Sequence, residues 1–438
     1  MQVLKFGGTS VGTAERIKNV ARLIVERGRN IVVLSAMSGT TNSLVEIADY
    51  LYKGNSRGAM ETIFALESKY ADTVRQLLGD DDYAAEARTV LRGIFNFLRT
   101  FTPEGFDTVR EKEILAQGEL MSTTLMSLYL RQSGYICDVL PALDYMSTDA
   151  DGEPRMESIE RKLKAMVQRH PEADVLLTQG YICRNHLGDV DNLRRGGSDY
   201  TASIIGAVLE VEEVQIWTDI DGMHNNDPRY VDNTSPVHEL HFDEAAELAY
   251  FGAKILHPTC VLPAKLHNIP VRLLNTLEPT AEGTMIHSAA PADGKIKAIA
   301  AKDGIIAVKV RSGRMLMAYG FLHQVFETFE RYRTPVDMVA TSEVCVSLTI
   351  DNDQYLRPIV DDLKKFGTVS VDRDMVIICA VGDLDWHNCG FQADVLNALR
   401  DVPVRMISFG GSNYNISVLV HAADKKRALN ALSAALFQ

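Results

Sequence analysis

The chain has 438 residues, which is more than one hydrophobic core usually organises, so we expect a large domain and one or more smaller ones. Apolar residues make up 46% of the chain and charged residues 24%, and no segment approaches the ~20 apolar residues that span a bilayer. A membrane protein is therefore not expected. The net charge of −13 argues against nucleic acid as a partner, because nucleic-acid binding usually needs a basic surface.

Two further features of the composition concern location and metals. The N-terminal residues lack the charged and apolar regions of a secretory signal, so we expect a cytoplasmic protein. The six cysteines show neither a CxxC pair nor the spacing of metal ligands, and most lie in apolar runs. We therefore expect reduced, mostly buried thiols and no metal site made of protein side chains.

The first part of the chain alternates strands and helices. Residues 3–6 read as a strand that runs into a glycine turn, residues 14–27 have helical periodicity, and the pattern repeats with a strand at 31–34 and a helix at 42–52. The later elements expected are helices within 58–100 and at 118–132, and strands at 136–140, 175–179 and 213–218. Such alternation implies an α/β fold with a mainly parallel sheet and helices on both faces.

A second region follows a linker of small residues at 288–294. We expect a large domain at 1–290 and a smaller region at 298–438. In the smaller region one pattern occurs twice: a helix, a strand, a polar turn and a second strand, at 322–332, 336–339 and 345–350, and again at 392–400, 404–407 and 416–420. This predicts two β-α-β-β units at about 305–370 and 371–438, with interleaving left open. The duplication fits a structural role or ligand sensing.

A lysine and two glycines mark the end of the first strand. Lys5 is followed by Gly7, Gly8 and Ser10 in a tight turn before a helix. Backbone N–H groups in such a turn attract anions, and a lysine beside them suits phosphate. An ordinary strand-to-helix turn is the alternative.

Three later stretches have a similar character. Arg195, Ser198 and Asp199 precede a helix expected to begin near Tyr200, where Asp199 could also be a simple helix cap. Thr218 and Asp219 follow a strand and lead to Asp227 and Arg229, in the type of loop where α/β sheets bind nucleotides. Lys254 lies on a loop or helix end, and its alternative is a solvated surface lysine.

Together these stretches match one family. The chain resembles, over its whole length, the monofunctional aspartate kinases of the amino-acid kinase superfamily. The resemblance rests on KFGGTSV, VVLSAMSGTTN, GELMS, RGGSDYTA, WTDIDG, DPR and FGAKILHP, which occur in the family's order and spacing, and on TSEVCVSLTID, which resembles its regulatory module of ferredoxin-like ACT units.

The resemblance implies roles for individual residues. It implies catalytic roles for Lys5, Asp199 and Lys254. It implies ATP binding by Lys5, Gly7, Gly8, Ser10, Thr218, Asp219, Asp227, Arg229 and Lys254. It implies aspartate binding by Ser35, Thr41, Glu119, Arg195, Ser198 and Asp199, with Arg195 pairing the α-carboxylate.

The implied reaction is phosphorylation of the side chain of L-aspartate by ATP to give 4-phospho-L-aspartate, the first step of lysine, threonine and methionine biosynthesis. The acceptor carboxylate is ionised at neutral pH and needs no general base. Positioning and charge neutralisation suffice, and Lys5, Lys254 and a Mg²⁺ ion held mainly through the nucleotide phosphates supply the positive charge.

The resemblance also implies feedback inhibition by an end-product amino acid, with lysine expected and threonine as the alternative. The implied effector residues are Met315, Ala318, Phe321, Leu322, Val336, Asp337, Ser342 and Glu343. The Asp337 carboxylate is expected to receive the ε-ammonium group of lysine. A homodimer or a dimer of dimers through the ACT units is expected.

Two positions depart from the family. Ala318 replaces a serine of lysine-inhibited relatives, and His224 stands where relatives carry a tyrosine in the nucleotide loop, so we leave His224 out of the site.

Three other functions compete. The first is another kinase of the superfamily that acts on glutamate, acetylglutamate or uridylate, against which GELMS and RGGSDYTA argue. The second is an amino-acid-binding regulator without activity, which would leave the Lys5 and Arg195 clusters without a task. The third is a fusion to homoserine dehydrogenase, which is not expected because the sequence stops at Gln438.

Overall fold

The computed structural model describes residues 1–193, 196–252, 256–291, 293–313 and 319–437, and the chain divides into two compact units. The first unit comprises Met1–Met223, His238–Phe242 and Leu256–Ala289. The second comprises His224–Val237, Asp243–Ile255 and Ala290–Gln438. Two short segments of the first 290 residues therefore belong to the same unit as the C-terminal region.

The first unit is built on an eight-stranded sheet with the order β3-β4-β2-β1-β7-β9-β10-β8. Neighbouring strands are parallel except for β10, which is antiparallel to β9. The central strands are buried and almost wholly apolar, as expected for a sheet covered on both faces. Their bounds are β1 Val3–Phe6, β2 Asn30–Leu34, β3 Cys137–Val139, β4 Val175–Gln179, β7 Val214–Thr218, β8 Glu239–Leu240, β9 Val271–Asn275 and β10 Thr284–Ile286.

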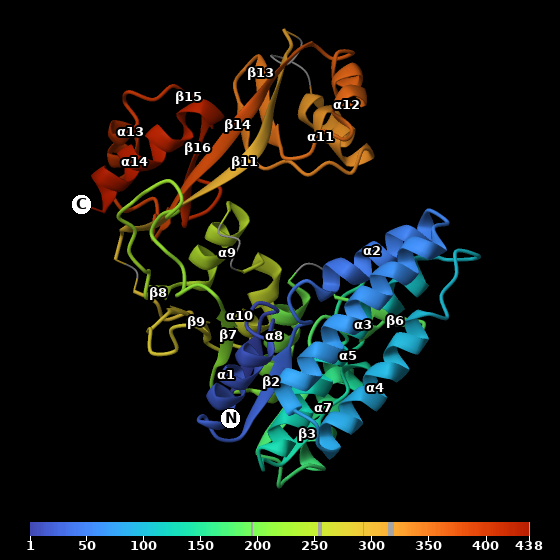
Figure 1. The fold of residues 1–438 in the computed structure, drawn as a ribbon. Coiled ribbons are helices and arrows are strands. Elements are labelled where there is room, and N and C mark those ends of the chain that lie inside the picture. The colour runs from blue at the N-terminus through green and yellow to red at the C-terminus, as the bar shows by residue number, and fades with distance from the viewer. Residues whose placement is uncertain (194–195, 253–255, 292, 314–318, 438) are drawn as a thin grey trace. The chain divides into compact units, whose positions relative to one another are not determined.

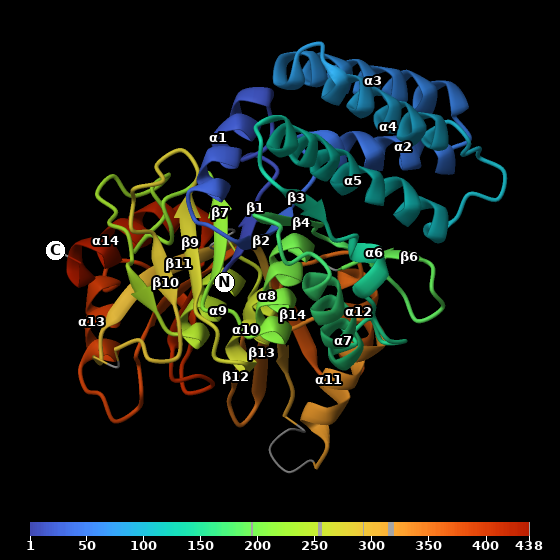
Figure 2. The same cartoon turned by 90° about the horizontal axis from the view of Figure 1, so that it is seen from below.

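Helices cover both faces of this sheet, which confirms the predicted α/β class. Figure 2 shows α1 and the long helices α2 to α5 on one face and α7, α8 and α10 on the other. The first group comprises α1 Ala14–Val25, α2 Thr40–Tyr52, α3 Ser56–Leu78, α4 Asp82–Leu98 and α5 Thr108–Gln132. The remaining elements are α6 Ala142–Tyr145, α7 Met156–Gln168, α8 Gly197–Leu209, η1 Pro258–Val261, α10 Leu262–Leu266 and the small hairpin β5 Ile182–Arg184 with β6 Val190–Asn192.

The helix predicted from residue 118 is longer than expected. It begins at Thr108, capped by the side chain of Asp107, so Gly118 lies in its interior. A Cβ at Gly118 would lie 2.8 Å from the Cβ of Ala36 and 3.3 Å from Cδ1 of Leu44. The glycine marks a close approach between α5 and the turn after β2, and not the start of a helix.

The second unit contains a six-stranded sheet with the order β12-β13-β11-β14-β16-β15, in which every pairing is antiparallel. Its strands are β11 Ile296–Arg311, β12 Val339–Thr341, β13 Cys345–Ile350, β14 Thr368–Gly382, β15 Val404–Ser408 and β16 Asn415–His421. Its helices are α11 Phe321–Arg331, α12 Leu356–Leu363, α13 Phe391–Ala398, η3 Ala422–Asp424 and α14 Lys425–Leu436, and most of α9 Phe242–Tyr250 also lies in this unit.

The two long strands β11 and β14 each run through both halves of this sheet (Figure 1). Ile306 and Val308 belong to one hydrophobic cluster, with α11 and α12, whereas Ile299 and Val376 belong to another, with α13 and α14. The pairing of β11 with β14 shifts register between Lys302 and the residues after it, where one cluster gives way to the other. The ferredoxin-like ACT pair thus forms one continuous sheet.

The strand predicted at 336–339 is displaced. β12 begins only at Val339, because the backbone before it pairs irregularly with β13. Asp337 donates its N–H to the carbonyl of Thr349, but Met338 donates to the hydroxyl of Thr349, which interrupts the ladder.

Two further expectations can be compared with the structure. Among the described residues, no helix has both the length and the apolar character needed to cross a bilayer. All six cysteines are free thiols; Cys137, Cys183, Cys260 and Cys379 are buried as predicted, whereas Cys389 is exposed.

Candidate active site

Lys5 lies on the central strand of the first unit. β1 is flanked by β2 and β7, and all four of its residues are buried. Nζ of Lys5 lies 2.6 Å from Oδ1 of Asp199, and the two side chains are 11% and 12% exposed. The ion pair therefore keeps some contact with solvent near the carboxyl end of the sheet, which is the edge where open α/β sheets bind ligands.

The first turn of α8 holds Asp199. The helix begins at Gly197, earlier than the predicted start near Tyr200, and follows Gly196 in a left-handed conformation. A carboxylate in the first turn is stabilised by the helix dipole. Asp199 combines this position with the ion pair to Lys5, so the capping role and the functional role are compatible.

The turn after β1 packs directly on the turn after β2. A Cβ at Gly8 would lie 2.6 Å from the carbonyl oxygen of Ala36, so only glycine fits there without a shift of the backbone. The carbonyl of Gly8 accepts a hydrogen bond of 3.0 Å from the N–H of Ser38. The two turns together form one wall of the site.

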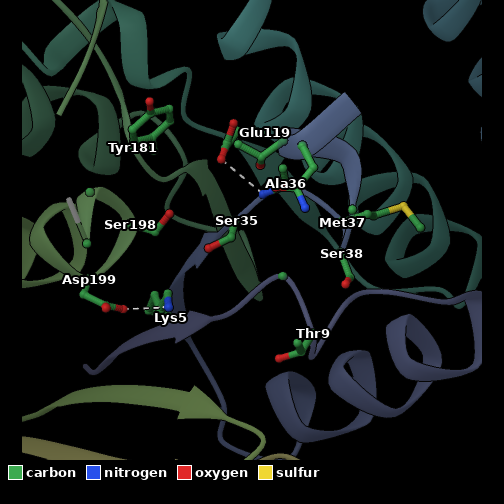
Figure 3. Close-up of a pocket in the computed structure, with 16 residues that line it drawn as sticks. Lys5, Thr9, Ser35, Ala36, Met37, Ser38, Glu119, Tyr181, Ser198 and Asp199 are labelled. Carbon is green, nitrogen blue, oxygen red and sulfur yellow. Dashed lines mark hydrogen bonds and ion pairs between the residues drawn. The ribbon is translucent and has the colours of Figure 1, made fainter. Parts of the chain in front are cut away.

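A cavity of about 450 Å³ opens between these elements. In the view of Figure 3, Ser35 and Ser198 lie between the Lys5–Asp199 pair and Glu119. The lining residues are Lys5, Gly8, Thr9, Ser35, Ala36, Met37, Ser38, Gly39, Thr41, Asn42, Glu119, Tyr181, Gly196, Gly197, Ser198 and Asp199. The cavity thus brings together the predicted residues Lys5, Gly8, Ser35, Thr41, Glu119, Ser198 and Asp199.

Glu119 is a buried acid in this cavity. It lies on α5, is 4% exposed, and accepts a hydrogen bond of 3.2 Å from the N–H of Ala36. Burial raises the pKa of the Glu119 carboxyl to about 8, although backbone hydrogen bonds act in the opposite direction. The group is therefore largely protonated at neutral pH, and an ammonium group in the cavity would favour its ionised form.

Gly7 and Ser10 belong to the turn after β1, and Thr218 is the last residue of the neighbouring strand β7; these three residues are not among those that line the cavity. Ser10 Oγ is 3.2 Å from Oγ1 of Thr276, which donates a hydrogen bond of 2.9 Å to the carbonyl of Thr218. The Thr218 hydroxyl donates to Asp219, and Asp219 is exposed. Thr276 connects these residues and was not predicted.

Two other residues predicted to bind the nucleotide, Asp227 and Arg229, do not belong to the first unit. Asp227 and Arg229 belong to the second compact unit, where Nη2 of Arg229 lies 2.6 Å from Oδ2 of Asp227. Burial opposes ionisation of Asp227, but hydrogen bonds and the charge of Arg229 outweigh it and lower the pKa of the carboxyl. Arg195 and Lys254 lie outside the described residues.

Tyr181 is a lining residue that the sequence reasoning missed. It follows β4, has a left-handed backbone with φ of 68°, and donates its N–H to the hydroxyl of Thr201. Burial, reinforced by the charge of Glu119, raises the pKa of the Tyr181 hydroxyl to about 12, so this hydroxyl remains a donor at neutral pH. Its place just beyond a strand end is the only signal in the sequence. Ser38 and Asn42, beside the predicted Thr41, were also missed.

The predicted effector residues that the structure describes lie in the half of the sheet that carries α11 and α12. Phe321 and Val336 pack in its hydrophobic cluster, and Leu322 is 41% exposed. Ser342 and Glu343 lie in the exposed turn between β12 and β13. Met315 and Ala318 lie outside the described residues.

Asp337 has a cationic partner within the chain. Its side chain is 2% exposed, and Oδ1 lies 2.8 Å from Nζ of Lys302 and accepts a hydrogen bond of 2.5 Å from the hydroxyl of Tyr250. Lys302 also pairs with Asp351 at 3.0 Å. Within the described part of the chain, the buried Oδ2 of Asp337 has no hydrogen-bond partner, so the carboxylate retains an acceptor.

Sequence comparisons agree with this fold. A model of the amino acid kinase family matches residues 1–275, and an ACT domain model matches residues 378–436. The chain is 34% identical to aspartokinase 3, chloroplastic, of Arabidopsis thaliana, with 100% of this chain and 81% of that protein aligned. It is 31% identical to lysine-sensitive aspartokinase 3 of Escherichia coli (strain K12), with 100% and 99% aligned.

Structural comparisons lead to the same family. The crystal structure of E. coli aspartokinase III in complex with aspartate and ADP matches with a TM-score of 0.84 and 30% identity, over 100% of both chains. The same enzyme in complex with lysine and aspartate matches with a TM-score of 0.82 and 30% identity, again over 100% of both chains. The chain therefore belongs to the amino acid kinase family, and within that family it is an ATP-dependent aspartate kinase with C-terminal ACT domains.

Proposed function

We propose that the chain transfers the γ-phosphoryl group of ATP to the side-chain carboxylate of L-aspartate and releases ADP and 4-phospho-L-aspartate. A carboxylate oxygen attacks the γ-phosphorus, and the bond from that phosphorus to the bridging oxygen breaks, so ADP leaves with the electron pair. The observation that carries this proposal is the Lys5–Asp199 ion pair at 2.6 Å on the wall of a cavity that also holds the buried Glu119.

Charge neutralisation is the main task of the proposed site. The attacking carboxylate and the γ-phosphate are both anions, so their approach in line requires cations close to the phosphoryl oxygens. Lys5 provides one such charge, and Asp199 holds its ammonium group in place. We assign Lys254 the same task on the basis of the family motif.

The acceptor is recognised through its charged groups. We assign the ammonium group of aspartate to Glu119, whose buried carboxyl would give up its proton and ionise as the ammonium group binds. Arg195 is assigned to the α-carboxylate. Hydrogen bonds from hydroxyl groups complete the proposed aspartate site at Ser35, Thr41 and Ser198.

The nucleotide is assigned to the residues that the family motifs mark for it. Mg²⁺ is expected to be held mainly by phosphate oxygens, where it neutralises their charge. The described residues contain no cluster of three or more side chains suited to hold a metal ion. The proposed ATP residues are Lys5, Gly7, Gly8, Ser10, Thr218, Asp219, Asp227, Arg229 and Lys254.

We also propose that lysine inhibits the enzyme through the ACT unit that contains Asp337, with threonine as the second candidate. The lysine-sensitive relative and the lysine complex of E. coli aspartokinase III support this choice. The unpartnered Oδ2 of Asp337 offers an acceptor for the ε-ammonium group. Inhibition requires that lysine bind an inactive arrangement more tightly than the active one.

The proposed organisation assigns residues 1–290 to catalysis and 298–438 to regulation in a cytoplasmic homodimer or dimer of dimers. The reaction would be the first step of lysine, threonine and methionine biosynthesis.

One assay tests the reaction. The full chain is incubated with MgATP and L-aspartate, ADP is measured by a coupled assay, and the acyl phosphate is trapped with hydroxylamine. We expect equal amounts of ADP and hydroxamate with aspartate, and little of either with glutamate, acetylglutamate or UMP as acceptor. ADP formed without hydroxamate would contradict a carboxylate acceptor.

A further inference from the structure

The segment at 224–237, here named the nucleotide loop, packs on the C-terminal helix of its own compact unit. It carries Asp227 and Arg229. Val231 of this loop belongs to the same hydrophobic cluster as Leu429 and Leu432 of α14, and Tyr230 packs against that cluster. A segment with a proposed role in binding ATP is thus anchored on the last helix of the ACT region.

Two asparagine side chains, one from the loop and one from the helix, connect the two segments on either side of the Asp227–Arg229 pair. Asn226 is 2% exposed and donates from Nδ2 to the carbonyl of Leu429 at 3.3 Å. Asn430 donates from Nδ2 to the carbonyl of Tyr230 at 3.0 Å. These bonds restrain the loop immediately before Asp227 and immediately after Arg229.

Lys425 adds a buried charge to this anchor. Its side chain is 7% exposed, and Nζ lies 2.9 and 2.7 Å from the two carboxylate oxygens of Asp303. The same Nζ lies 4.0 Å from the centroid of the Tyr230 ring. A buried ammonium is costly unless paired, and the carboxylate and the ring face together compensate it, so Lys425 fixes the ring beside Arg229.

We propose that Lys425 and Asn430 are positioning residues for ATP: they hold Tyr230, and through it Arg229, in the conformation that binds the nucleotide. This inference rests on the proposed nucleotide role of Asp227 and Arg229. It gives the last helix of the ACT region a part in the phosphoryl-transfer reaction itself, separate from any effector.

The test compares four variants of the full chain. Lys425→Met removes the charge and keeps the aliphatic stem, and Lys425→Arg keeps the charge. Asn430→Ala, at an exposed position, removes the hydrogen bond to the carbonyl of Tyr230 and a second one to the carbonyl of Lys426 within α14. Lys426→Met is the matched control, because Lys426 is the next residue and is exposed. The measurements are kcat, the KM values for MgATP and aspartate, the Kd for ADP by calorimetry, and the Tm.

We expect Lys425→Met to raise the KM for MgATP and the Kd for ADP about fivefold to tenfold, and Asn430→Ala about threefold, as the loss of one or two weak contacts would. The KM for aspartate should stay within about twofold. Lys425→Arg should recover part of the loss, and Lys426→Met should match the wild type. A purely structural role would instead lower the Tm and change both KM values together, which would overturn the proposal.

A further variant, Arg229→Ala, separates this inference from the proposed function. If Arg229→Ala weakens ADP binding but neither Lys425→Met nor Asn430→Ala does, the positioning role is wrong and the nucleotide role survives. If none of the three variants changes nucleotide binding, both proposals are wrong.

Discussion

Lys5 is an ionisable residue on an otherwise apolar, buried strand, and its ammonium group forms an ion pair with Asp199. A buried ammonium needs a partner, and a fixed carboxylate keeps it in one position while a second anion approaches. The Lys5–Asp199 ion pair therefore compensates the buried charge in the folded chain and also holds the ammonium group where it can contact phosphoryl oxygens.

Replacement of Lys5 tests this role. We expect Lys5→Ala to lower kcat at least ~100-fold with a smaller change in the KM for aspartate, because the lost charge acts on the phosphoryl group and not on the acceptor. Steady-state kinetics with varied aspartate and saturating MgATP measures both values. Lys53→Ala is the control, since Lys53 is an exposed lysine on the helix end after β2. A Lys5→Ala enzyme with near-normal turnover would refute the assignment.

Glu119 predicts a dependence on pH. Its pKa is about 8 in the folded chain, against an ordinary value of 4.5, so the folded state holds an extra proton between these values and loses stability as the pH rises through them. Glu119→Gln keeps an acceptor for Ala36 but cannot ionise. We expect it to be more stable than the wild type by about 4 kcal/mol at pH 8.5, since each unit of pKa difference corresponds to about 1.4 kcal/mol, and about equally stable at pH 4.5. Thermal unfolding at both values measures this.

The same residue should shape the pH profile of activity. Since the ionised carboxylate binds the ammonium group of aspartate, kcat/KM for aspartate should rise with pH up to about 8 in the wild type. Glu119→Gln should lose this rise and most of its use of aspartate. An unchanged profile would mean that Glu119 does not bind the substrate.

Residues in motifs were predictable from the sequence, and residues placed by tertiary packing were not. Lys5, Glu119 and Asp199 stand in recognisable stretches, and the cavity brings them together. Tyr181 and Thr276 carry no such mark, because their positions depend on which strand ends become neighbours in the sheet.

At the scale of elements, two glycines inside helices of the first unit have different surroundings. Gly118 in α5 touches the turn after β2, whereas a Cβ at Gly93 in α4 would meet nothing within 4 Å. At Gly118, an alanine Cβ would be too close to its neighbours and would push α5 away from the turn. At Gly93, an alanine would meet no atom and would only remove the conformational freedom of glycine.

These two glycines form a matched pair for mutagenesis. We expect Gly118→Ala to destabilise the chain by about 1–3 kcal/mol and to raise the KM for aspartate, because it displaces Ala36, the hydrogen-bond partner of Glu119. Gly93→Ala should stabilise the chain by about 0.5–1 kcal/mol and leave the KM unchanged. Denaturant unfolding and steady-state kinetics measure both effects. Equal stability of the two variants would contradict the packing described for α5.

Alternation of strands and helices was sufficient to predict the α/β class of the first unit and its strands β1, β2, β3, β4 and β7, since buried parallel strands leave apolar runs. The strands β8, β9 and β10 and the hairpin of β5 and β6 were not predicted. The residues at which individual helices and strands begin were harder to predict. The interior position of Gly118 and the irregular start of β12 depend on contacts with Ala36 and Thr349, which lie far away in the sequence or across the sheet.

At the scale of the whole molecule, the proposed regulation by lysine depends on the carboxylate of Asp337. Asp337 already pairs with Lys302, so an effector ammonium has to share the carboxylate through its second oxygen. We expect Asp337→Asn to abolish inhibition by millimolar lysine with kcat nearly unchanged, because the amide keeps the shape of the site but attracts no cation.

The control for this variant is Asp353→Asn, which makes the same change of charge at an exposed ion pair with Arg373. Activity at increasing lysine concentration should fall for the wild type and the control only. If the wild type responds to threonine and not to lysine, the effector is wrong and the sensing role remains. If no amino acid inhibits or binds, the regulatory proposal fails.

The shared strands β11 and β14 have a consequence for how this region can change in evolution. Each strand contributes one end to the cluster with α11 and α12 and the other end to the cluster with α13 and α14. In the chain, α11 and α12 lie between the two shared strands, and α13 and α14 follow them. A single crossover between two genes therefore cannot exchange one half intact, because any junction that separates the halves cuts a strand that both halves use. The duplicated halves are therefore expected to have diverged together, as one inherited block, and a hybrid with a new effector specificity would need two matched junctions within the strands.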